Sequence, residues 1–306
     1  MVLKEIIQRT PNIYNSNTMK GQVGRGYQQK TILKLNQMEV RKTFDDIDLQ
    51  QKFEENGYVI VPFLAEDEAK TLVDFYLENR LEQHSSGLHS SILHDDPVFK
   101  KGSFEKITAA FELEAPKYLT DYVPILAQYL VKEAFTDDRF KLHLDPALTD
   151  ESKYTAVSIW CALEDITKEN GAMFVNPKGH KNVYFARASG PPIYFSEQIQ
   201  SETAVKVIEL KRGEAFIASQ KIPHGSMPNN TDKPRIAANL RLIPREADNL
   251  IYYKELNGDL SIYKVSQDYY KHAYADEPGS RPKDEGLIMQ IEQASIKSGI
   301  ESMHLH

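Results

Sequence analysis

The chain has 306 residues, of which 41% are apolar, and a formal net charge of −7. That length suffices for one large domain with a sizeable core. The acidic balance provides no overall positive field for a phosphate backbone, so we expect no nucleic-acid partner. A single cysteine, Cys161, excludes an internal disulfide and a thiolate metal cage built by this chain alone. No run approaches the roughly 20 apolar residues of a membrane span, and we expect a cytoplasmic protein that does not bind membranes.

Three parts follow one another along the chain. Residues 1–45 are polar and predict an arm or extension, in which the alternating run 31–40 could form an edge strand. Residues 46–248 predict the main domain. Residues 249–306 predict a hairpin and a helix that pack on that domain.

The first 120 residues predict mainly helices. Helices are expected over residues 44–57, 65–83 and 97–119, because their apolar side chains recur near helical spacing. We expect the last of these to break near Glu114 or Pro116. A buried strand is expected between the first two helices, over residues 58–63.

Short β-rich runs dominate from residue 125 onwards, separated by turn residues such as Asn170-Gly171. They cover residues 124–135, 139–145, 154–163, 171–177, 204–210, 214–220 and 234–244. This many short strands favours a barrel or a sandwich. A hairpin is expected over residues 249–265, with Asn257-Gly258 in a type I′ turn, and a final helix over residues 283–299.

The strand expected over residues 139–145 ends in a His-x-Asp pattern that suits a metal site. His143 and Asp145 are two residues apart, so both side chains project from the same face of the strand. Two histidines and one carboxylate on one face of a metal ion leave positions open for a 2-oxoglutarate chelate and O2, as non-haem iron oxygenases require. The third ligand must come from a distant strand, where His224 is available. Eleven residues later, Arg235 could hold the distal carboxylate of 2-oxoglutarate through its forked guanidinium.

Each part of this pattern alone has a simpler explanation. A lone histidine on a strand is more often a hydrogen-bonded structural residue than a ligand. His94, Asp95 and Asp96 form a second His-x-Asp triplet, but it lies in a polar stretch directly before Pro97 and favours a loop or a helix cap.

Two long segments resemble the phytanoyl-CoA dioxygenase family. HLDPALTDESKYTAVSIWCALEDITKENGAMFVNPKGHK resembles that family's ligand strand, its Trp-containing strand and its Glu-Asn-Gly turn, and LKRGEAFIASQKIPHGSMPNNTDKPRIAANLRLIP resembles the segment with its distal histidine and arginine. The resemblance, over residues 50–245, implies a mainly β fold, a double-stranded β-helix (jelly-roll, cupin-like) barrel flanked by N-terminal helices. The iron(II) ligands that it implies are His143, Asp145 and His224. The residues that it implies for the distal carboxylate of 2-oxoglutarate are Arg235 and Ser226.

Four further residues are candidates for the site. Trp160 matches a family tryptophan near the co-substrate, although it can also be a plain core residue. Asn239 and Arg241 share the alternation face of Arg235 and are candidate substrate contacts, but Arg241 could equally end in solvent beyond the barrel rim. His180 stands in a loop that departs from the family's usual Pro-Gly-Ser-His, and a structural histidine bonded to a carbonyl is favoured over a catalytic one.

The function expected is an Fe(II)- and 2-oxoglutarate-dependent dioxygenase that uses O2 to hydroxylate an unactivated C–H bond of a small-molecule metabolite, releasing succinate and CO2. Asp145 argues against the related halogenases, in which a small residue replaces the metal carboxylate. One alternative is a non-catalytic binding or scaffold protein that retains the fold. Another is a cupin-type metal enzyme that works without 2-oxoglutarate, which would leave Arg235 without a purpose. The sequence predicts neither the substrate nor the oligomeric state.

Overall fold

The computed structural model describes residues 41–80, 87–137, 139–182, 187–188, 205–272 and 280–291. Most of the expected N-terminal arm, including the run 31–40, lies outside these ranges. Within the described ranges, no helix combines the length and the apolar character needed to cross a membrane.

Three helices of the N-terminal part lie close to their predicted positions, namely α3 (Ile47–Asn56), α4 (Glu66–Asn79) and α5 (Pro97–Glu112). The side chain of Asp46 accepts a hydrogen bond from the backbone N–H of Leu49 and so caps α3, which ends at Gly57 with φ +85°. α5 ends before the predicted break, and a short 3-10 turn, Ala115–Lys117, follows it.

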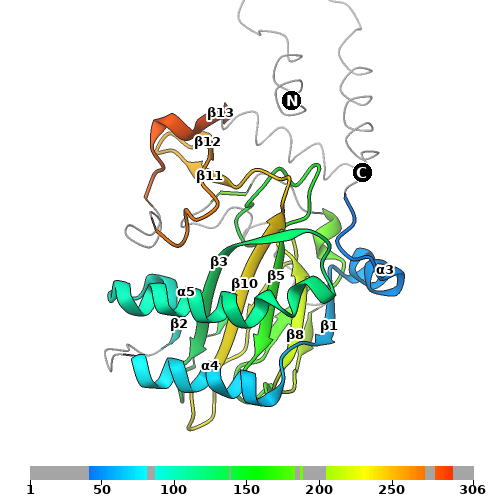
Figure 1. Cartoon of the computed structure of the whole chain (residues 1–306), viewed down its shortest axis with the longest axis vertical. Helices are drawn as coiled ribbons and strands as arrows, with labels where there is room; N and C mark the ends of the chain where they lie inside the picture. Colours follow the sequence, from blue (N-terminus) through cyan, green and yellow to red (C-terminus); the bar gives the residue numbers. More distant parts are fainter. Residues whose placement is uncertain are drawn as a thin grey trace, which may run out of the picture. The chain divides into compact units, whose positions relative to one another are not determined.

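The main sheet has six antiparallel strands in the order β1-β8-β5-β10-β3-β2. Their bounds are Tyr58–Pro62 (β1), Glu214–Ser219 (β8), Val157–Ala162 (β5), Arg235–Pro244 (β10), Tyr122–Lys132 (β3) and Leu88–Ser90 (β2). Helices α4 and α5 cover one face of this sheet (Figure 1). The hydroxyl of Tyr129 on β3 donates to the carbonyl of Leu72 on α4 across this layer.

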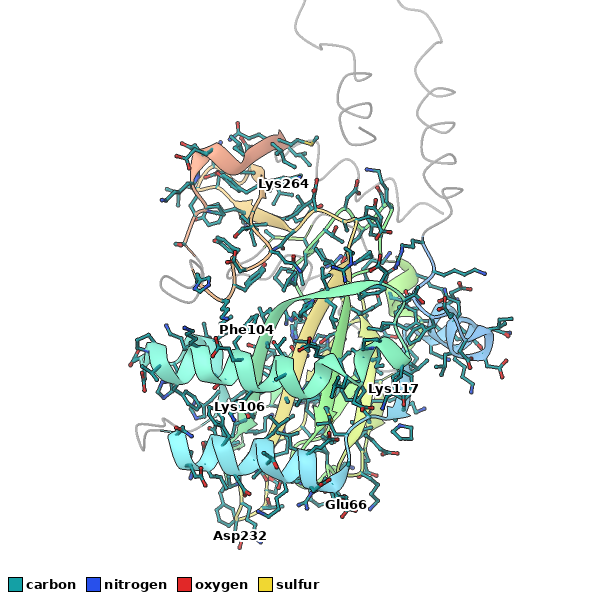
Figure 2. The ribbon with its side chains drawn as sticks, in the orientation of Figure 1. Glu66, Phe104, Lys106, Lys117, Asp232 and Lys264 are labelled. Atoms are coloured by element: carbon teal, nitrogen blue, oxygen red, sulfur yellow. The ribbon has the colours of Figure 1, made fainter. Side chains whose placement is uncertain are left out.

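Helices α4 and α5 also contact each other. The ammonium of Lys106 on α5, labelled in Figure 2, lies 5.7 Å from the ring centroid of Phe75 on α4. Apolar side chains of both helices and of alternate strand positions form one buried cluster on this side of the sheet. The opposite alternate positions are therefore available to the interior between the sheets.

A second sheet has four antiparallel strands in the order β4-β9-β6-β7, with bounds Phe140–His143 (β4), His224–Ser226 (β9), Met173–Val175 (β6) and Lys206–Ile208 (β7). Trp160 and Phe216 of the main sheet pack with Met173 and Val175 of the second sheet in a buried cluster, so the two sheets face each other. This arrangement is the predicted double-stranded β-helix. In the described residues the two sheets are separate and do not close into a continuous barrel.

The C-terminal part forms a third sheet from β11 (Leu250–Lys254), β12 (Leu260–Lys264) and β13 (Leu287–Ile291). The predicted hairpin is present, but the type I′ turn is wrong. Lys254 pairs with Leu260, so the loop spans residues 255–259, and within it Gly258 has a positive φ whereas Asn257 does not.

The helix predicted over residues 283–299 is also wrong in its first half. Residues 284–286 form a 3-10 turn and residues 287–291 form β13. Leu287, Met289 and Ile291 alternate along that strand, and pairing with β12 outweighs the helical pattern of the segment. Residues 292–299 lie outside the described residues.

Candidate metal centre

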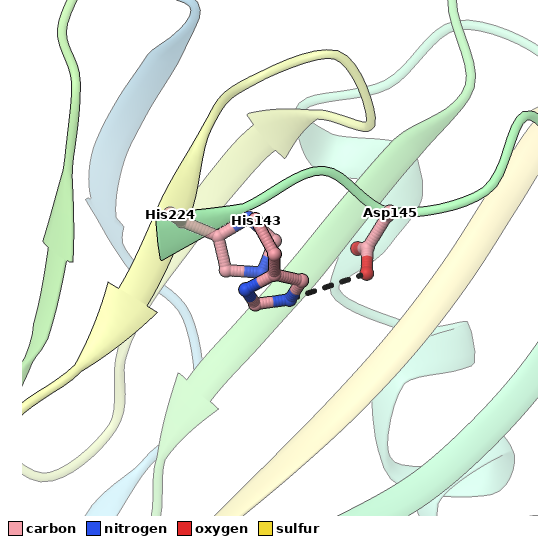
Figure 3. Close-up of side chains that lie close together, drawn as sticks. All are labelled: His143, Asp145 and His224. Atoms are coloured by element: carbon pink, nitrogen blue, oxygen red, sulfur yellow. Dashed lines mark ion pairs between the residues drawn. The ribbon is translucent and has the colours of Figure 1, made fainter. Parts of the chain in front are cut away.

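His143, Asp145 and His224 come together where β4 and β9 pair (Figure 3). His143 and His224 are register partners across the two strands, and Asp145 lies two residues after the end of β4. One ligand atom from each of the three residues lies within 4.8 Å of the others. In the described part of the chain, no other group of histidine, cysteine and acidic side chains meets this condition.

Glycine at position 225 allows β9 to approach β4. A Cβ atom added to Gly225 would collide with the backbone carbonyl oxygen of Phe140 and with the ring of Phe174. The two histidine-bearing strands are thus brought close by a residue without a side chain.

Both imidazoles are oriented by the backbone. Nδ1 of His143 lies 3.0 Å from the carbonyl oxygen of Lys141, and Nδ1 of His224 lies 3.0 Å from that of Ile222. A carbonyl oxygen can only accept, so each Nδ1 carries the proton and each Nε2 keeps its lone pair for a metal ion. Burial, together with the nearby His224, lowers the pKa of His143 to about 4, so this ring is neutral at neutral pH.

Asp145 is ionised although it is buried. Burial alone would raise its pKa, but the Arg241 guanidinium and the two imidazoles outweigh that effect and hold the pKa at about 2. Nη2 of Arg241 lies 3.0 Å from Oδ1 of Asp145. The sequence reasoning placed Arg241 on the inner face or at the rim, and the structure places it beside the carboxylate of the cluster.

Arg187 and Glu151 form a buried ion pair behind the cluster. The Arg187 guanidinium contacts both oxygens of Glu151, at 2.5 and 2.9 Å, and both side chains are at most 1% exposed. Nε of Arg187 donates to the backbone carbonyl of Asp145 (2.7 Å), and Nη2 donates to that of Gln220 (3.2 Å). Arg187 therefore connects the segment that carries Asp145 to the turn that leads into His224.

Arg235 begins β10 and is buried, with 2% of its surface exposed. Its Nε has no hydrogen-bond partner among the described residues, and its guanidinium carbon lies 5.2 Å from the ring centroid of Trp160. Burial lowers its pKa to about 10, opposed by the nearby Glu164. A buried donor of this kind requires an acceptor, and a carboxylate suits it.

Ser226 is linked to Arg235 through Lys132. Lys132 is the register partner of Arg235 on β3, and its ammonium donates to Oγ of Ser226 (2.8 Å) and to the carbonyl of Met227 (2.5 Å). Lys132 thus reaches from the main sheet to β9 of the second sheet. Arg235, Ser226 and Lys132 together provide a cationic and hydroxyl-lined site for an anion.

Asn239 and His180 both have partners within the protein. The Asn239 side-chain amide donates to Oγ of Ser158 (2.5 Å), and its carbonyl accepts from Gln128 (3.4 Å). His180 lies outside the cluster, where its Nε2 is 3.2 Å from the carbonyl oxygen of Glu54 and its ring fills the space over Gly57. This is the structural histidine that the sequence favoured.

The sequence reasoning missed three charged residues that support the cluster, Lys132, Glu151 and Arg187. Lys132 had a usable signal, because it shares the alternation face of Gln128 and Leu130 on a strand whose other residues are aliphatic or tyrosine. The Glu151–Arg187 pair had none, since both residues come from segments without regular periodicity.

A His-x-Asp pair and a distal histidine on paired strands inside a double-stranded β-helix define the mononuclear metal centre of the non-haem iron oxygenases. A profile of the phytanoyl-CoA dioxygenase (PhyH) family matches residues 53–237, and the chain belongs to this family. The family's cofactors, iron(II) and 2-oxoglutarate with O2, fit this donor set.

Two curated relatives are similar in sequence. Phytanoyl-CoA dioxygenase 1 of rice is 28% identical over 160 residues, which are 50% of this chain and 56% of the rice protein. A phytanoyl-CoA dioxygenase domain-containing protein 1 homologue of Dictyostelium discoideum is 24% identical over 212 residues, covering 66% of this chain and 68% of that protein. The match thus spans little more than half the length of the rice relative.

Two solved structures show the same fold at low sequence identity. The epimerase SnoN, crystallised with Fe3+, α-ketoglutarate and a nogalamycin, has a TM-score of 0.51 and 17% identity, with 80% of this chain and 96% of SnoN covered. HygX from Streptomyces hygroscopicus, with nickel and 2-oxoglutarate bound, has a TM-score of 0.50 and 14% identity, with 66% and 88% covered.

Proposed function

We propose that this protein is an Fe(II)- and 2-oxoglutarate-dependent dioxygenase that hydroxylates an unactivated C–H bond of a small-molecule metabolite. In this reaction the co-substrate and O2 yield succinate, CO2 and one oxygen atom inserted into the substrate. The observation that carries the proposal is the oriented cluster of two imidazoles and one ionised carboxylate in the same interior as a buried arginine with an unpartnered Nε.

The residues fit both cofactors. Nε2 of His143, Nε2 of His224 and a carboxylate oxygen of Asp145 are close enough to hold one ion, and this donor set is the one used for iron(II) with open coordination positions. Arg235 would hold the distal carboxylate of 2-oxoglutarate, with Ser226 as a further contact and Trp160 beside the guanidinium.

The chain's own residues bind and shield the reacting groups. When bound, iron(II) with 2-oxoglutarate and O2 supplies the oxidising power for C–H cleavage. Lys141 and Ile222 keep the protons of both rings on Nδ1, and Arg241 keeps Asp145 ionised. The packed cluster around Trp160 limits water between the sheets, and no general acid or base is required of these residues.

The first test is a binding experiment. Anaerobic addition of Fe(II) and 2-oxoglutarate should produce the weak visible charge-transfer band of the chelate, and Asp145→Ala should abolish it. A folded wild-type protein that gives no band would contradict the proposal and favour the non-catalytic scaffold.

The second test concerns the reaction. A metabolite screen should find a compound that stimulates succinate release above the uncoupled background, and mass spectrometry should show that the product has gained one oxygen atom. A product of unchanged composition would instead indicate an epimerase, the activity named for SnoN.

A further inference from the structure

We infer that Arg241 binds a carboxylate of the substrate, so that the substrates of this enzyme are small carboxylic acids. The inference rests on the proposed function and adds the substrate class to it. It depends on where Arg241 lies, on its unsatisfied donors and on the balance of charge in the centre.

Arg235 and Arg241 lie on the same strand, β10, and are six residues apart. Their Cα atoms are therefore separated by about 20 Å, at about 3.3 Å per residue. Arg235 pairs in register with Lys132 next to Ser226, whereas Arg241 contacts Asp145. With 2-oxoglutarate held at Arg235, Arg241 belongs to a different part of the centre, and that part is adjacent to the metal carboxylate.

The two arginines share an unusual property. Among the described residues, the guanidinium groups with a buried nitrogen that has no hydrogen-bond partner are those of Arg235 and Arg241, at Nε in each case. At Arg235 this unsatisfied donor fits the distal carboxylate of the co-substrate. The same feature at Arg241 indicates that a second acceptor binds there.

Asp145 accounts for only part of the hydrogen-bonding capacity of Arg241. The guanidinium has five N–H donors, and one nitrogen, Nη2, contacts Oδ1 of Asp145. The Arg241 side chain is 15% exposed, so it can be reached by a molecule in the centre. A planar fork of donors binds carboxylates through two parallel hydrogen bonds, which a neutral group cannot match in strength.

The balance of charge also favours an anion. Iron(II) and the two arginines outweigh Asp145 and the two carboxylates of 2-oxoglutarate by one positive charge. Of the other described charges nearby, Arg187 pairs with Glu151. Glu164 is a negative charge near Arg235, and Lys132, whose ammonium contacts Ser226, is a further positive charge, so these two leave the excess unchanged. A substrate with one negative charge would neutralise this excess in a buried centre, where charges interact more strongly than in water.

The experiment uses the full-length protein loaded anaerobically with Fe(II) and 2-oxoglutarate. The probes are short-chain and aromatic carboxylic acids, each paired with its primary amide, and the readout is the shift of the charge-transfer band on titration. The band itself tests the proposed function, and its response to the probes tests the inference. Wild-type protein should respond to acids at concentrations about ten- to a hundredfold lower than to the matched amides, as expected for a charge-assisted hydrogen bond.

Two variants assign this preference to Arg241. Arg241→Gln should remove the preference for acids, and Arg241→Lys should keep it with about tenfold weaker affinity, because lysine retains the charge but not the fork. Arg245→Gln is the matched control, since Arg245 follows the same strand, is 64% exposed and pairs with Asp121 outside the centre. It should behave as the wild type.

Two results would overturn the inference. One is an equal response of the wild-type protein to acids and amides. The other is an acid preference that survives unchanged in Arg241→Gln. If Arg241→Gln no longer forms the band, Arg241→Lys is the variant to compare with the wild type. If Arg241→Lys then bound the acids as tightly as the wild type does, Arg241 would not make a forked contact with them.

Discussion

Replacing Glu151 with Gln removes the carboxylate that pairs with Arg187 while keeping the size of the side chain. The pair is almost fully buried, with 0% and 1% of the two side chains exposed. Removing one partner of a buried ion pair costs about 3–5 kcal/mol, because the remaining charge loses its compensation. Domains are stable by only about 5–15 kcal/mol, so this change should lower the urea midpoint markedly.

The same substitution should weaken metal binding without touching a ligand. Arg187 donates to the backbone carbonyls of Asp145 and Gln220, so a displaced Arg187 disturbs both segments that bring ligands to the centre. Loss of such outer contacts reduces metal affinity by about 10- to 100-fold. Titration with Mn(II), followed by electron paramagnetic resonance, measures this affinity.

Two controls separate a local effect from general damage. Arg245→Gln breaks the exposed pair with Asp121 and should change stability by at most about 1 kcal/mol. The double variant Glu151→Leu with Arg187→Met replaces the pair with apolar groups and should recover much of the lost stability. If Glu151→Gln matched Arg245→Gln in both urea midpoint and Mn(II) affinity, Arg187 would not position the ligand segments.

Other substitutions give separate tests. Arg235→Lys should raise the apparent KM for 2-oxoglutarate about tenfold or more while Mn(II) affinity is unchanged, and an unchanged KM would contradict the assigned contact. Gly225→Ala should abolish metal binding, because its Cβ meets backbone and ring atoms; normal Mn(II) binding would show that β9 can shift. Burial raises the pKa of the Cys161 thiol, so iodoacetamide should modify it only after unfolding. Burial lowers the pKa of His180 to about 4, below that of an unfolded histidine near 6.5; its contribution to stability is present above about pH 6.5 and is lost as the pH falls towards 4. His180→Gln should therefore show a smaller drop in urea midpoint between pH 7 and pH 5 than the wild type, and an equal drop would refute this assignment.

The sequence was most informative where one periodic pattern dominated. Helix α3 has both a capping Asp46 and a terminal Gly57, and it formed within a few residues of its predicted range. The run 234–244 has its polar residues, Arg235, Asn239 and Arg241, on one alternation face, and it became β10. Residues 287–291 have apolar positions compatible with either period, and only their pairing with β12 decides in favour of a strand.

For the candidate centre, the sequence identified the residues proposed to contact the metal ion and 2-oxoglutarate, but not the residues that position them. His143 and Asp145 could be paired because strand geometry places residues two apart on one face. The contact of Arg241 with Asp145 depends on how the main sheet faces the second sheet, and no local pattern encodes that. The Glu151–Arg187 pair joins residues from two irregular segments that are brought together only by the tertiary fold.

The division of the centre between two sheets has a mechanical consequence. The histidines belong to the second sheet and the two arginines to β10 of the main sheet. A metal ion bound by the histidines, with its co-substrate held by Arg235, would therefore connect the two sheets. Without ligands, the hydrogen bond from Lys132 to Ser226 is one contact that connects the two sheets. Ligand at a hundred times its Kd adds about 2.7 kcal/mol to stability. That gain should slow amide hydrogen exchange in both sheets at once, so the loaded enzyme would open as a single cooperative unit.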